Sequence, residues 1–367
     1  MPDNVPRQLD GAVPHPSASN PGHDVSVVFL PNVKMQTKRA AVAAEDGPNP
    51  GREGGGIEQY GVKGTERDLH AFPWNPLVNK GSLLAGLDLL RALKVLLFDR
   101  KADVIVSVFE SNVFFVLMLR RLFRFKPKIV LWEVSGRGWP KRDKILDYVV
   151  PRVDQVFVLT EDQRATVEAQ YKLRHPAQIL GFAIDDKFFR SRPDVSDGQY
   201  VLAVGDDISR DYPTLIEACR QAGLPLKLRS GAKFAMPDDV SHVSFVGRLS
   251  YKELRELYEQ ATIVVVPLKQ SDYPGGITAI YEAMSMSKPL VVSRTTMTTG
   301  LVQHAEEGML VTPGDPVVLA GELSSLWGDQ QARAALGRAA RQRLDRDFSN
   351  ARYMQRFATL LRQAAGR

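Results

Sequence analysis

The sequence has one cysteine and no long apolar run, and each absence excludes a class of protein. Cys219 cannot form an intramolecular disulfide, and its place in the helical pattern YPTLIEACRQAG predicts a buried apolar role. No segment approaches the roughly 18 consecutive apolar residues of a membrane-spanning helix. The most apolar segment, NVFFVLMLRRLF, is broken by arginines and is predicted to be a core helix.

Two further signals are missing. Residues 1–23 lack the charged-then-apolar layout of a signal peptide and are rich in Pro, Ser and Asn, so we expect a disordered tail on a cytoplasmic protein. No G-x-G-x-x-G motif opens a helix after the first strand of either half of the chain. This absence disfavours a nicotinamide dehydrogenase.

The composition is that of an ordinary globular protein, with 44% apolar and 25% charged residues. A length of 367 residues favours two domains. The net charge is +6, and the cations concentrate between Arg120 and Lys144, close to Trp132 and Trp139, whose presence favours an interfacial site. A solvated rim and an anionic membrane surface both remain open for this segment, and nucleic acid is disfavoured.

Short apolar runs alternate with helical patterns along the whole chain, which predicts an α/β fold with two parallel sheets. In the first half the runs are DVSVVFLP, ADVIVSVFE, PKIVLWEV and DQVFVLT; in the second they are QYVLAVG, LPLKLRSG, HVSFVG, ATIVVVP, KPLVVS and GMLVTP. We expect a tail (1–23), a first domain (24–190), a second domain (191–348) and a terminal helix packing back on the first domain (349–367). For the Gly- and Pro-rich segment 43–76, a loop or lid and a flexible insertion both remain open.

The stretch DYPGGITAIYEAMS, residues 272–285, raises the question of what Glu282 does. A helix is expected to begin near Ile277, and its periodicity makes it apolar or small on nearly every side except at Thr278 and Glu282. A buried carboxylate needs a hydrogen-bond partner. Two partners are open: a fixed Arg or Lys of the protein, or the vicinal hydroxyls of a bound ribose or sugar.

The loops around this helix have the composition of an anion site. Gly275 and Gly276 allow close approach of a ligand, the helix start presents free N–H groups, and Lys269 adds a cation. Arg210 follows the strand that ends at Gly205, and its alternative role is a surface salt bridge to a neighbouring aspartate. Anion and hydroxyl recognition together predict a nucleotide ligand.

From about Tyr200 to Phe348 the sequence resembles the retaining, nucleotide-sugar-dependent glycosyltransferases of GT-B fold, in particular the large family 4 group. The resemblance rests on YEAMSMSKPLVVS, GMLVTPGDPVVLA and FVGRLSYKELRELYEQATIVVVP, with GFAIDDKFF similar to the stretch that closes the first domain. It implies two Rossmann-like domains facing a central cleft. It also implies transfer of a hexose-type sugar from a nucleoside diphosphate to a glycan or lipid-linked acceptor, in bacterial-type polysaccharide or glycoconjugate synthesis.

The resemblance also implies roles for individual residues. Glu282 matches the second Glu of the family's Glu, seven residues, Glu motif, which holds the ribose. Amides from Gly276 through Ile277 to Thr278 would cradle the diphosphate, and Arg210 would neutralise it. The expected catalytic set is Arg210, Lys269 and Glu282; the expected donor-binding set is Gly205, Arg248, Leu249, Asp272, Gly275, Gly276, Ile277, Thr278 and Glu282.

The sequence departs from the family pattern at several positions. Pro274 stands where the family's first Glu grips the donor sugar, and Asp272 is a candidate substitute. Asp206 follows Gly205 where the family commonly has Arg. The family's histidine after the fourth strand is replaced by WEVSG, so the acceptor side is assigned to Glu110, Glu133 and Ser135. The Gly pair after strand one is also missing from FLPNVKMQ.

We expect catalysis without a metal or cofactor. Departure of a nucleoside diphosphate places negative charge on phosphate oxygens, which preorganised donors stabilise. The Asp pairs in VGDDIS, AIDDKF and MPDDVS lack the Asp-x-Asp spacing and suit helix caps and turns. A nucleotide-sugar epimerase and an inactive nucleotide-sugar-binding relative remain alternatives. The acceptor is left open among a polyprenyl-linked sugar, a lipid and a soluble sugar.

Overall fold

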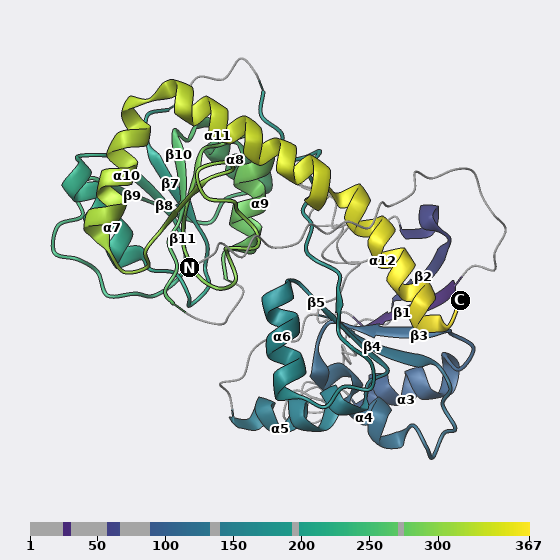
Figure 1. The fold of residues 1–367 in the computed structure, drawn as a ribbon. Coiled ribbons are helices and arrows are strands. Elements are labelled where there is room, and N and C mark those ends of the chain that lie inside the picture. Colours follow the sequence, from purple (N-terminus) through teal and green to yellow (C-terminus); the bar gives the residue numbers. More distant parts are fainter. Residues whose placement is uncertain (1–24, 31–56, 67–88, 133–139, 193–197, 271–274) are drawn as a thin grey trace, which may run out of the picture.

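The computed structural model describes residues 25–30, 57–66, 89–132, 140–192, 198–270 and 275–367. They form two α/β lobes, and Figure 1 shows the chain passing from one lobe to the other and returning through the last helix. Among the described residues, no helix is both long enough and apolar enough to cross a bilayer.

The first lobe is built on a parallel six-stranded sheet of order β2-β1-β3-β4-β5-β6. Its strands are β1 (Val25–Leu30), β2 (Val62–Glu66), β3 (Val104–Ser107), β4 (Lys128–Trp132), β5 (Gln155–Val158) and β6 (Gln178–Ile179). Its helices are η2 (Ile57–Tyr60), α3 (Leu89–Phe98), α4 (Glu110–Leu119), α5 (Pro140–Val149), η4 (Val150–Arg152) and α6 (Glu161–Gln170).

Both faces of this sheet are buried, because successive side chains of a strand point to opposite sides. Val28 and Leu30 pack with residues of α3 to α6, whereas Val27 and Phe29 pack on the opposite face. That opposite face is covered by α12 (Asn350–Ala365), which places Phe357 in one cluster with β1, β3, β4 and β5. The helix that follows the second lobe therefore completes the core of the first.

The second lobe has a parallel sheet of order β12-β11-β10-β7-β8-β9. Its strands are β7 (Val201–Val204), β8 (Leu226–Arg229), β9 (Val243–Val246), β10 (Ile263–Val266), β11 (Leu290–Ser293) and β12 (Met309–Val311). Its helices are α7 (Tyr212–Ala222), α8 (Tyr251–Gln260), α9 (Ile277–Ser285), α10 (Pro316–Gly328) and α11 (Gln330–Arg343), which runs into the π-helical turn η5 (Leu344–Phe348). Read from β9, this is the Rossmann strand order 3-2-1-4-5-6.

The segment between the lobes packs on the second lobe. Phe182 makes an edge contact with Tyr281 of α9, and Phe189 makes one with Tyr258 of α8, at centroid distances of 5.9 and 6.3 Å. The predicted boundary at residue 190 stays a prediction, since residues 193–197 lie outside the described part of the chain.

Most predicted elements are confirmed, and two expectations are wrong. The segment 43–76 was expected to be irregular, yet Val62–Glu66 pairs in parallel with β1 as the edge strand β2. Its sequence VKGTE carries one buried apolar residue, so pairing rather than hydrophobic patterning forms the strand. Trp132 was expected near an interfacial surface, but it is buried against Tyr353 and Phe357 of α12.

The predicted N-terminal tail, residues 1–23, and most of the predicted loop lie outside the described residues. The segment LVNKGSLLAGLDLLRALKVLLFDR, residues 77–100, has a helical pattern, and the structure describes α3 within it. Cys219 is buried in α7, and burial raises the pKa of its thiol to about 12. This confirms the predicted apolar role.

Candidate functional site

The candidate site lies where β7 and β10 end side by side. These neighbouring strands are hydrogen-bonded in parallel, and their following helices, α7 and α9, lead to strands on opposite sides of the pair. Ligands of doubly wound sheets bind at this switch point, outside the carboxyl ends of the strands. Gly205 follows β7, and Gly275 and Gly276 precede α9, so three predicted site residues meet here.

The loop after β7 is anchored through Gly205. Its carbonyl accepts hydrogen bonds from the Tyr212 hydroxyl (2.5 Å) and the Ser230 hydroxyl (2.7 Å). Its φ of +149° is a conformation that favours glycine, and a Cβ at this position would overlap the guanidinium of Arg210. Glycine is therefore required for Arg210 to lie across the strand end.

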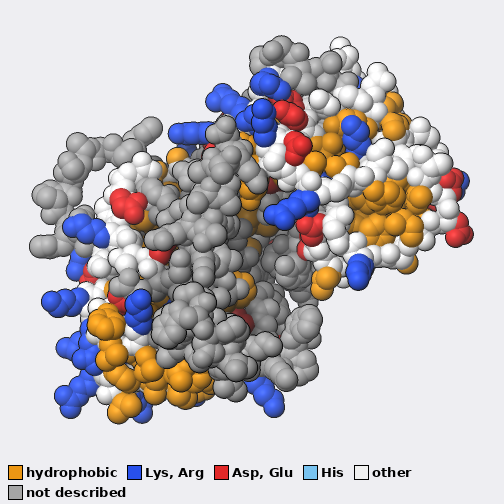
Figure 2. Space-filling view, turned by 180° about the vertical axis from the view of Figure 1, so that it is seen from behind, with side chains coloured by type: hydrophobic (Ala, Val, Ile, Leu, Met, Phe, Trp, Pro, Cys, Tyr) orange, Lys and Arg blue, Asp and Glu red, His pale blue; other side chains and the backbone are white. Residues whose placement is uncertain are grey.

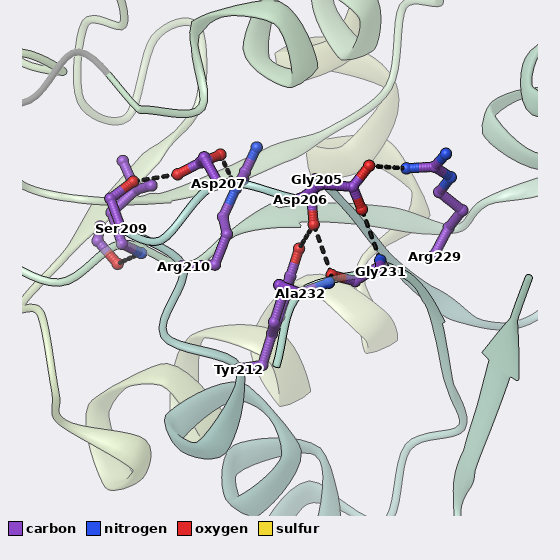
Figure 3. A network of polar contacts seen from close by, with 12 residues as sticks. Gly205, Asp206, Asp207, Ser209, Arg210, Tyr212, Arg229, Gly231 and Ala232 are labelled. Atoms are coloured by element: carbon purple, nitrogen blue, oxygen red, sulfur yellow. Dashed lines mark hydrogen bonds and ion pairs between the residues drawn. The ribbon is translucent and has the colours of Figure 1, made fainter. Parts of the chain in front are cut away.

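Arg210 is buried, with 5% of the residue exposed. Its Nε donates to Oδ2 of Asp207 at 2.7 Å, and Oδ1 of Asp207 accepts a hydrogen bond from Ser209 (Figure 3). The Nη1 atom is buried and has no hydrogen-bond partner among the described residues. The expected alternative, a surface salt bridge, is half right: the ion pair with Asp207 exists, but it is buried and leaves one donor nitrogen unused.

The loop after β10 is tied to the Arg210 loop by backbone contacts. The Lys269 amide donates to the Ser209 carbonyl at 2.8 Å, the Asp211 amide donates to the Pro267 carbonyl at 3.1 Å, and Arg210 forms an isolated β-bridge with Leu268. The two loops therefore form one unit at the switch point.

Helix α9 begins against this unit, as predicted for Ile277. A Cβ on Gly275 would overlap Ser209, so the glycine brings the helix start into contact with the Arg210 loop. No side chain of the described residues caps the helix. The first amides, those of Ile277, Thr278 and Ala279, have no acceptor within the helix, and they carry the positive end of its dipole. A buried guanidinium and an uncapped helix N-terminus together offer the donors that an anion site requires.

Gly276 provides a first test of this geometry. It holds φ +79°, and a Cβ there would lie 2.6 Å from Cγ1 of Val266. We expect Gly276→Ala to lower the free energy of unfolding by about 1–3 kcal/mol, because alanine is strained at this positive φ and its Cβ would overlap Val266.

The matched control is Gly321→Ala on the exposed side of α10, where the added Cβ meets no atom within 4 Å. Since alanine is the better helix former, this change is expected to raise the free energy of unfolding by about 0.5–1 kcal/mol. Urea unfolding of both variants measures the difference. Equal stabilities would contradict a strained helix start.

Glu282 is buried in α9, with 7% of the residue exposed. Its Oε2 accepts a hydrogen bond from the Tyr258 hydroxyl of α8 at 2.8 Å. Burial raises the pKa of Glu282 to about 7, against the opposing effects of this hydrogen bond and of Arg210 and Arg229. Burial also raises the pKa of Tyr258 well above its usual value, so the phenol stays a donor.

The Tyr258 hydroxyl is neither of the two partners expected for Glu282. A tyrosine hydroxyl fixes the carboxylate through Oε2 without neutralising its charge. Sequence reasoning missed Tyr258 because its helix was identified by periodicity alone, and helical periodicity marks a buried face without showing which side chain meets Glu282.

Asp206, the residue that follows Gly205, forms a second cluster beside the first (Figure 3). Its carboxylate accepts hydrogen bonds from the Arg229 guanidinium (2.7 Å) and the Gly231 amide (2.6 Å). Partial burial opposes ionisation, but these donors prevail and lower the pKa of Asp206. The departure at Asp206 thus has a structural role: it holds Arg229 at the end of β8.

The other predicted site residues lie at exposed positions, on other elements or outside the described part of the chain. Lys269 and Arg248 are exposed, Thr278 is exposed at the start of α9, and Leu249 is half-buried between β9 and α8. Glu110 is buried in the first turn of α4, after the carboxyl end of β3. Four further positions lie outside the described residues: Glu133, Ser135, Asp272 and Pro274.

Within the described residues, no group of three or more His, Cys, Asp or Glu side chains is arranged to hold a metal ion. The arrangement instead offers hydrogen-bond donors to an anion and a carboxylate oxygen to hydroxyls.

A Glycosyl transferases group 1 family model matches residues 240–343. The match contains α8 and α9, and hence both Tyr258 and Glu282. An uncharacterised glycosyltransferase of Methanocaldococcus jannaschii is 25% identical over 197 residues, which are 52% of this chain and 54% of that protein. The glycogen synthase of Mycobacterium tuberculosis is 37% identical over 105 residues, which are 28% of this chain and 24% of that protein. The chain thus matches about half the length of the first relative and less of the second.

Solved structures share the whole architecture. Anabaena HepE, in complex with UDP and glucose, has a TM-score of 0.66 and 17% identity, covering 91% of this chain and 98% of that one. Sucrose-phosphate synthase from Thermosynechococcus elongatus has a TM-score of 0.69 and 17% identity, covering 92% and 98%. These likenesses show the fold alone, and the predicted GT-B class is confirmed. Together with the matched domain, the relatives support a glycosyltransferase enzyme.

Proposed function

We propose that the protein transfers a hexose-type sugar from a nucleoside diphosphate to a glycan or lipid-linked acceptor, with retention of anomeric configuration. The observation that supports it most is the buried Arg210, whose Nη1 has no partner among the described residues, lying beside the uncapped start of α9. The ion pair with Asp207 uses Nε of Arg210 and leaves Nη1 without a partner, the helix start has no capping side chain among the described residues, and both groups suit a diphosphate.

The proposed donor pose follows from these groups. The diphosphate receives hydrogen bonds from Arg210 Nη1 and from the amides of Ile277 and Thr278. The ribose hydroxyls donate to Glu282, whose orientation is fixed by the Tyr258 hydroxyl. The base lies beside Arg248 and Leu249, which follow β9. Gly275 and Gly276 allow the diphosphate to approach the backbone.

The chemical step requires the leaving diphosphate to be stabilised as its bond to the sugar breaks. Donors already fixed by the fold do this without reorganisation at the moment of reaction. Arg210 is held in this way by Asp207, and Lys269, on the exposed side of the same unit, adds a second charge near the leaving group. Closure of the two lobes would exclude water that could otherwise hydrolyse the donor.

Three further proposals concern where the acceptor binds, which biosynthesis uses the product and where in the cell the protein acts. The acceptor binds against the first lobe, where Glu110 lies after the carboxyl end of β3. The product belongs to polysaccharide or glycoconjugate synthesis, and the protein acts in the cytoplasm, on the inner face of the plasma membrane. The donor needs no metal or other cofactor.

Transfer is tested with a panel of UDP-, GDP- and ADP-sugars. We expect one of them to raise the melting temperature by several degrees and, with a lipid-linked or glycan acceptor, to release nucleoside diphosphate. The anomeric configuration of the product is read by NMR.

Two results would contradict transfer. Conversion of the donor to an epimer without any acceptor would show an epimerase. Donor binding without turnover over a broad acceptor panel would show an inactive relative.

A further inference from the structure

Large apolar side chains are exposed to solvent at the carboxyl ends of α3 and α4. The exposed fractions are 52% for Leu97, 73% for Phe98, 47% for Met118 and 78% for Leu122. We name these four residues the α3–α4 patch. Large apolar side chains gathered on a surface mark an interaction site.

The two helix ends that carry the patch are adjacent in the fold. Arg100 donates through Nε to the Leu96 carbonyl at 3.0 Å and through Nη2 to the Phe123 carbonyl at 2.7 Å. Each carbonyl belongs to the residue next to a patch member, Leu97 or Leu122. Met118 lies in the last turn of α4, and Leu122 follows the helix four residues later. The two segments that carry the four exposed side chains therefore lie side by side.

The stretch of chain that carries this surface exposes positive charge. Over the described stretch 89–132, the exposed charged residues are all cations: Lys94, Arg100, Lys101, Arg121, Arg124, Lys126 and Lys128. The acidic residues there are buried or engaged: Asp99 and Glu110 are buried, and Asp103 accepts hydrogen bonds from the Ser26 amide and from Arg367. Helix α5, which packs on α4, adds exposed charges of both signs, Lys144 and Asp147.

Figure 2 shows apolar side chains next to Lys and Arg at the end of the first lobe that lies away from the second lobe. A second copy of this chain does not suit the patch, because a two-fold interface would bring the same cations of both copies together. An anionic surface suits both the apolar residues and the exposed cations of the same stretch.

We propose that the α3–α4 patch docks on an anionic phospholipid bilayer. Leu97, Phe98 and Leu122 enter the interface between headgroups and acyl chains, and the exposed cations of the same stretch contact the headgroups. Arg120 is not among these cations, since it pairs with Asp154 at 3.0 Å. The docking does not depend on the transfer reaction, and it would bring the first lobe to the location of a lipid-linked acceptor.

The test is co-sedimentation of the full chain with vesicles of phosphatidylcholine alone or of phosphatidylcholine mixed with phosphatidylglycerol. We expect binding to the mixed vesicles that weakens as salt is raised, and little binding to the neutral ones. The double variant Phe98→Ser with Leu122→Ser is expected to weaken binding about tenfold or more. Arg121→Gln and Arg124→Gln are expected to weaken it about fivefold each.

The matched control is Val317→Ser on α10, an exposed apolar residue (68%) outside the patch, which should leave vesicle binding unchanged. Donor-induced thermal shifts without vesicles should be the same in all variants, so failure of docking is distinguishable from failure of donor binding and sugar transfer. Absence of binding to anionic vesicles at low salt would overturn the proposal. So would a dimer in sedimentation velocity that Phe98→Ser converts to a monomer, which would make a second copy the occupant.

Discussion

Replacing Arg210 with alanine is expected to lower kcat for sugar transfer by about a hundredfold to a thousandfold, the effect of removing one preorganised donor from a developing oxyanion. The reason is the unused Nη1 of Arg210, buried beside the start of α9. Arg210→Lys keeps the charge but loses the planar donor set, so we expect an intermediate loss. Donor affinity and kcat are measured separately, by calorimetry and by release of nucleoside diphosphate.

Two controls make this prediction specific. Arg220→Ala removes an arginine of α7 whose guanidinium pairs with Glu217 at the surface, and it should change neither donor affinity nor kcat. Lys269→Ala removes the exposed cation of the same unit, and a smaller loss than for Arg210 is expected because water screens its charge. If Arg210→Ala left donor affinity and kcat unchanged while the protein stayed folded, Arg210 would have no role at the phosphates.

Replacing Glu282 with glutamine is expected to stabilise the protein at high pH and to weaken donor binding. The folded-state pKa of Glu282 is about 7, well above the ordinary value of a glutamate, because the carboxylate is buried. The folded state therefore binds more protons than the unfolded state between these values, and stability falls as pH rises through this window. Burial of the ionised carboxylate lowers the free energy of unfolding by about 3 kcal/mol, and this loss is fully present above pH 7.

Glutamine has no charge to bury, so Glu282→Gln should be more stable than the native protein above pH 7. The difference should vanish as pH falls toward the unfolded-state pKa. Urea unfolding at pH 5 and pH 8 checks the sign, and a gain that is the same at both pH values would contradict a buried, ionising carboxylate.

The same substitution should reduce donor affinity about tenfold, because a carboxylate accepts hydrogen bonds from hydroxyls more strongly than an amide does. Donor affinity of the native protein should also rise as pH passes through about 7, and that rise should be missing in the variant. Tyr258→Phe is the matched variant. It removes the 2.8 Å hydrogen bond to Glu282 but keeps the ring, so it should weaken donor binding while lowering stability at high pH.

Much of the fold could be predicted because it is encoded in local patterns. Parallel strands buried on both faces read as continuous apolar runs, and β7 and β10 to β12 follow this pattern. The start of α9 was also predictable, since two glycines precede an apolar helix. By contrast, VKGTE has no such run, and it forms β2 because β1 offers an edge for pairing.

The site was predictable in its residue types but not in its contacts. Glycines at strand ends and a lone carboxylate in an apolar helix pointed to Gly205, Gly276 and Glu282. The burial of Arg210 depends on the packing of its loop against the loop after β10, and the bond from Tyr258 depends on how α8 packs on α9. These contacts join residues far apart in sequence, and no local pattern reports them.

The position of α12 has a consequence for how the protein is made. Its side chains cover one face of the first sheet, yet the ribosome synthesises them after the entire second lobe. During translation that face, with Trp132 and Phe157, lacks its covering helix while the residues between Phe157 and α12, more than half of the chain, are synthesised. The lobe that is synthesised first therefore completes its core last. Until α12 has been synthesised and packed, the exposed apolar face makes the nascent chain prone to aggregation.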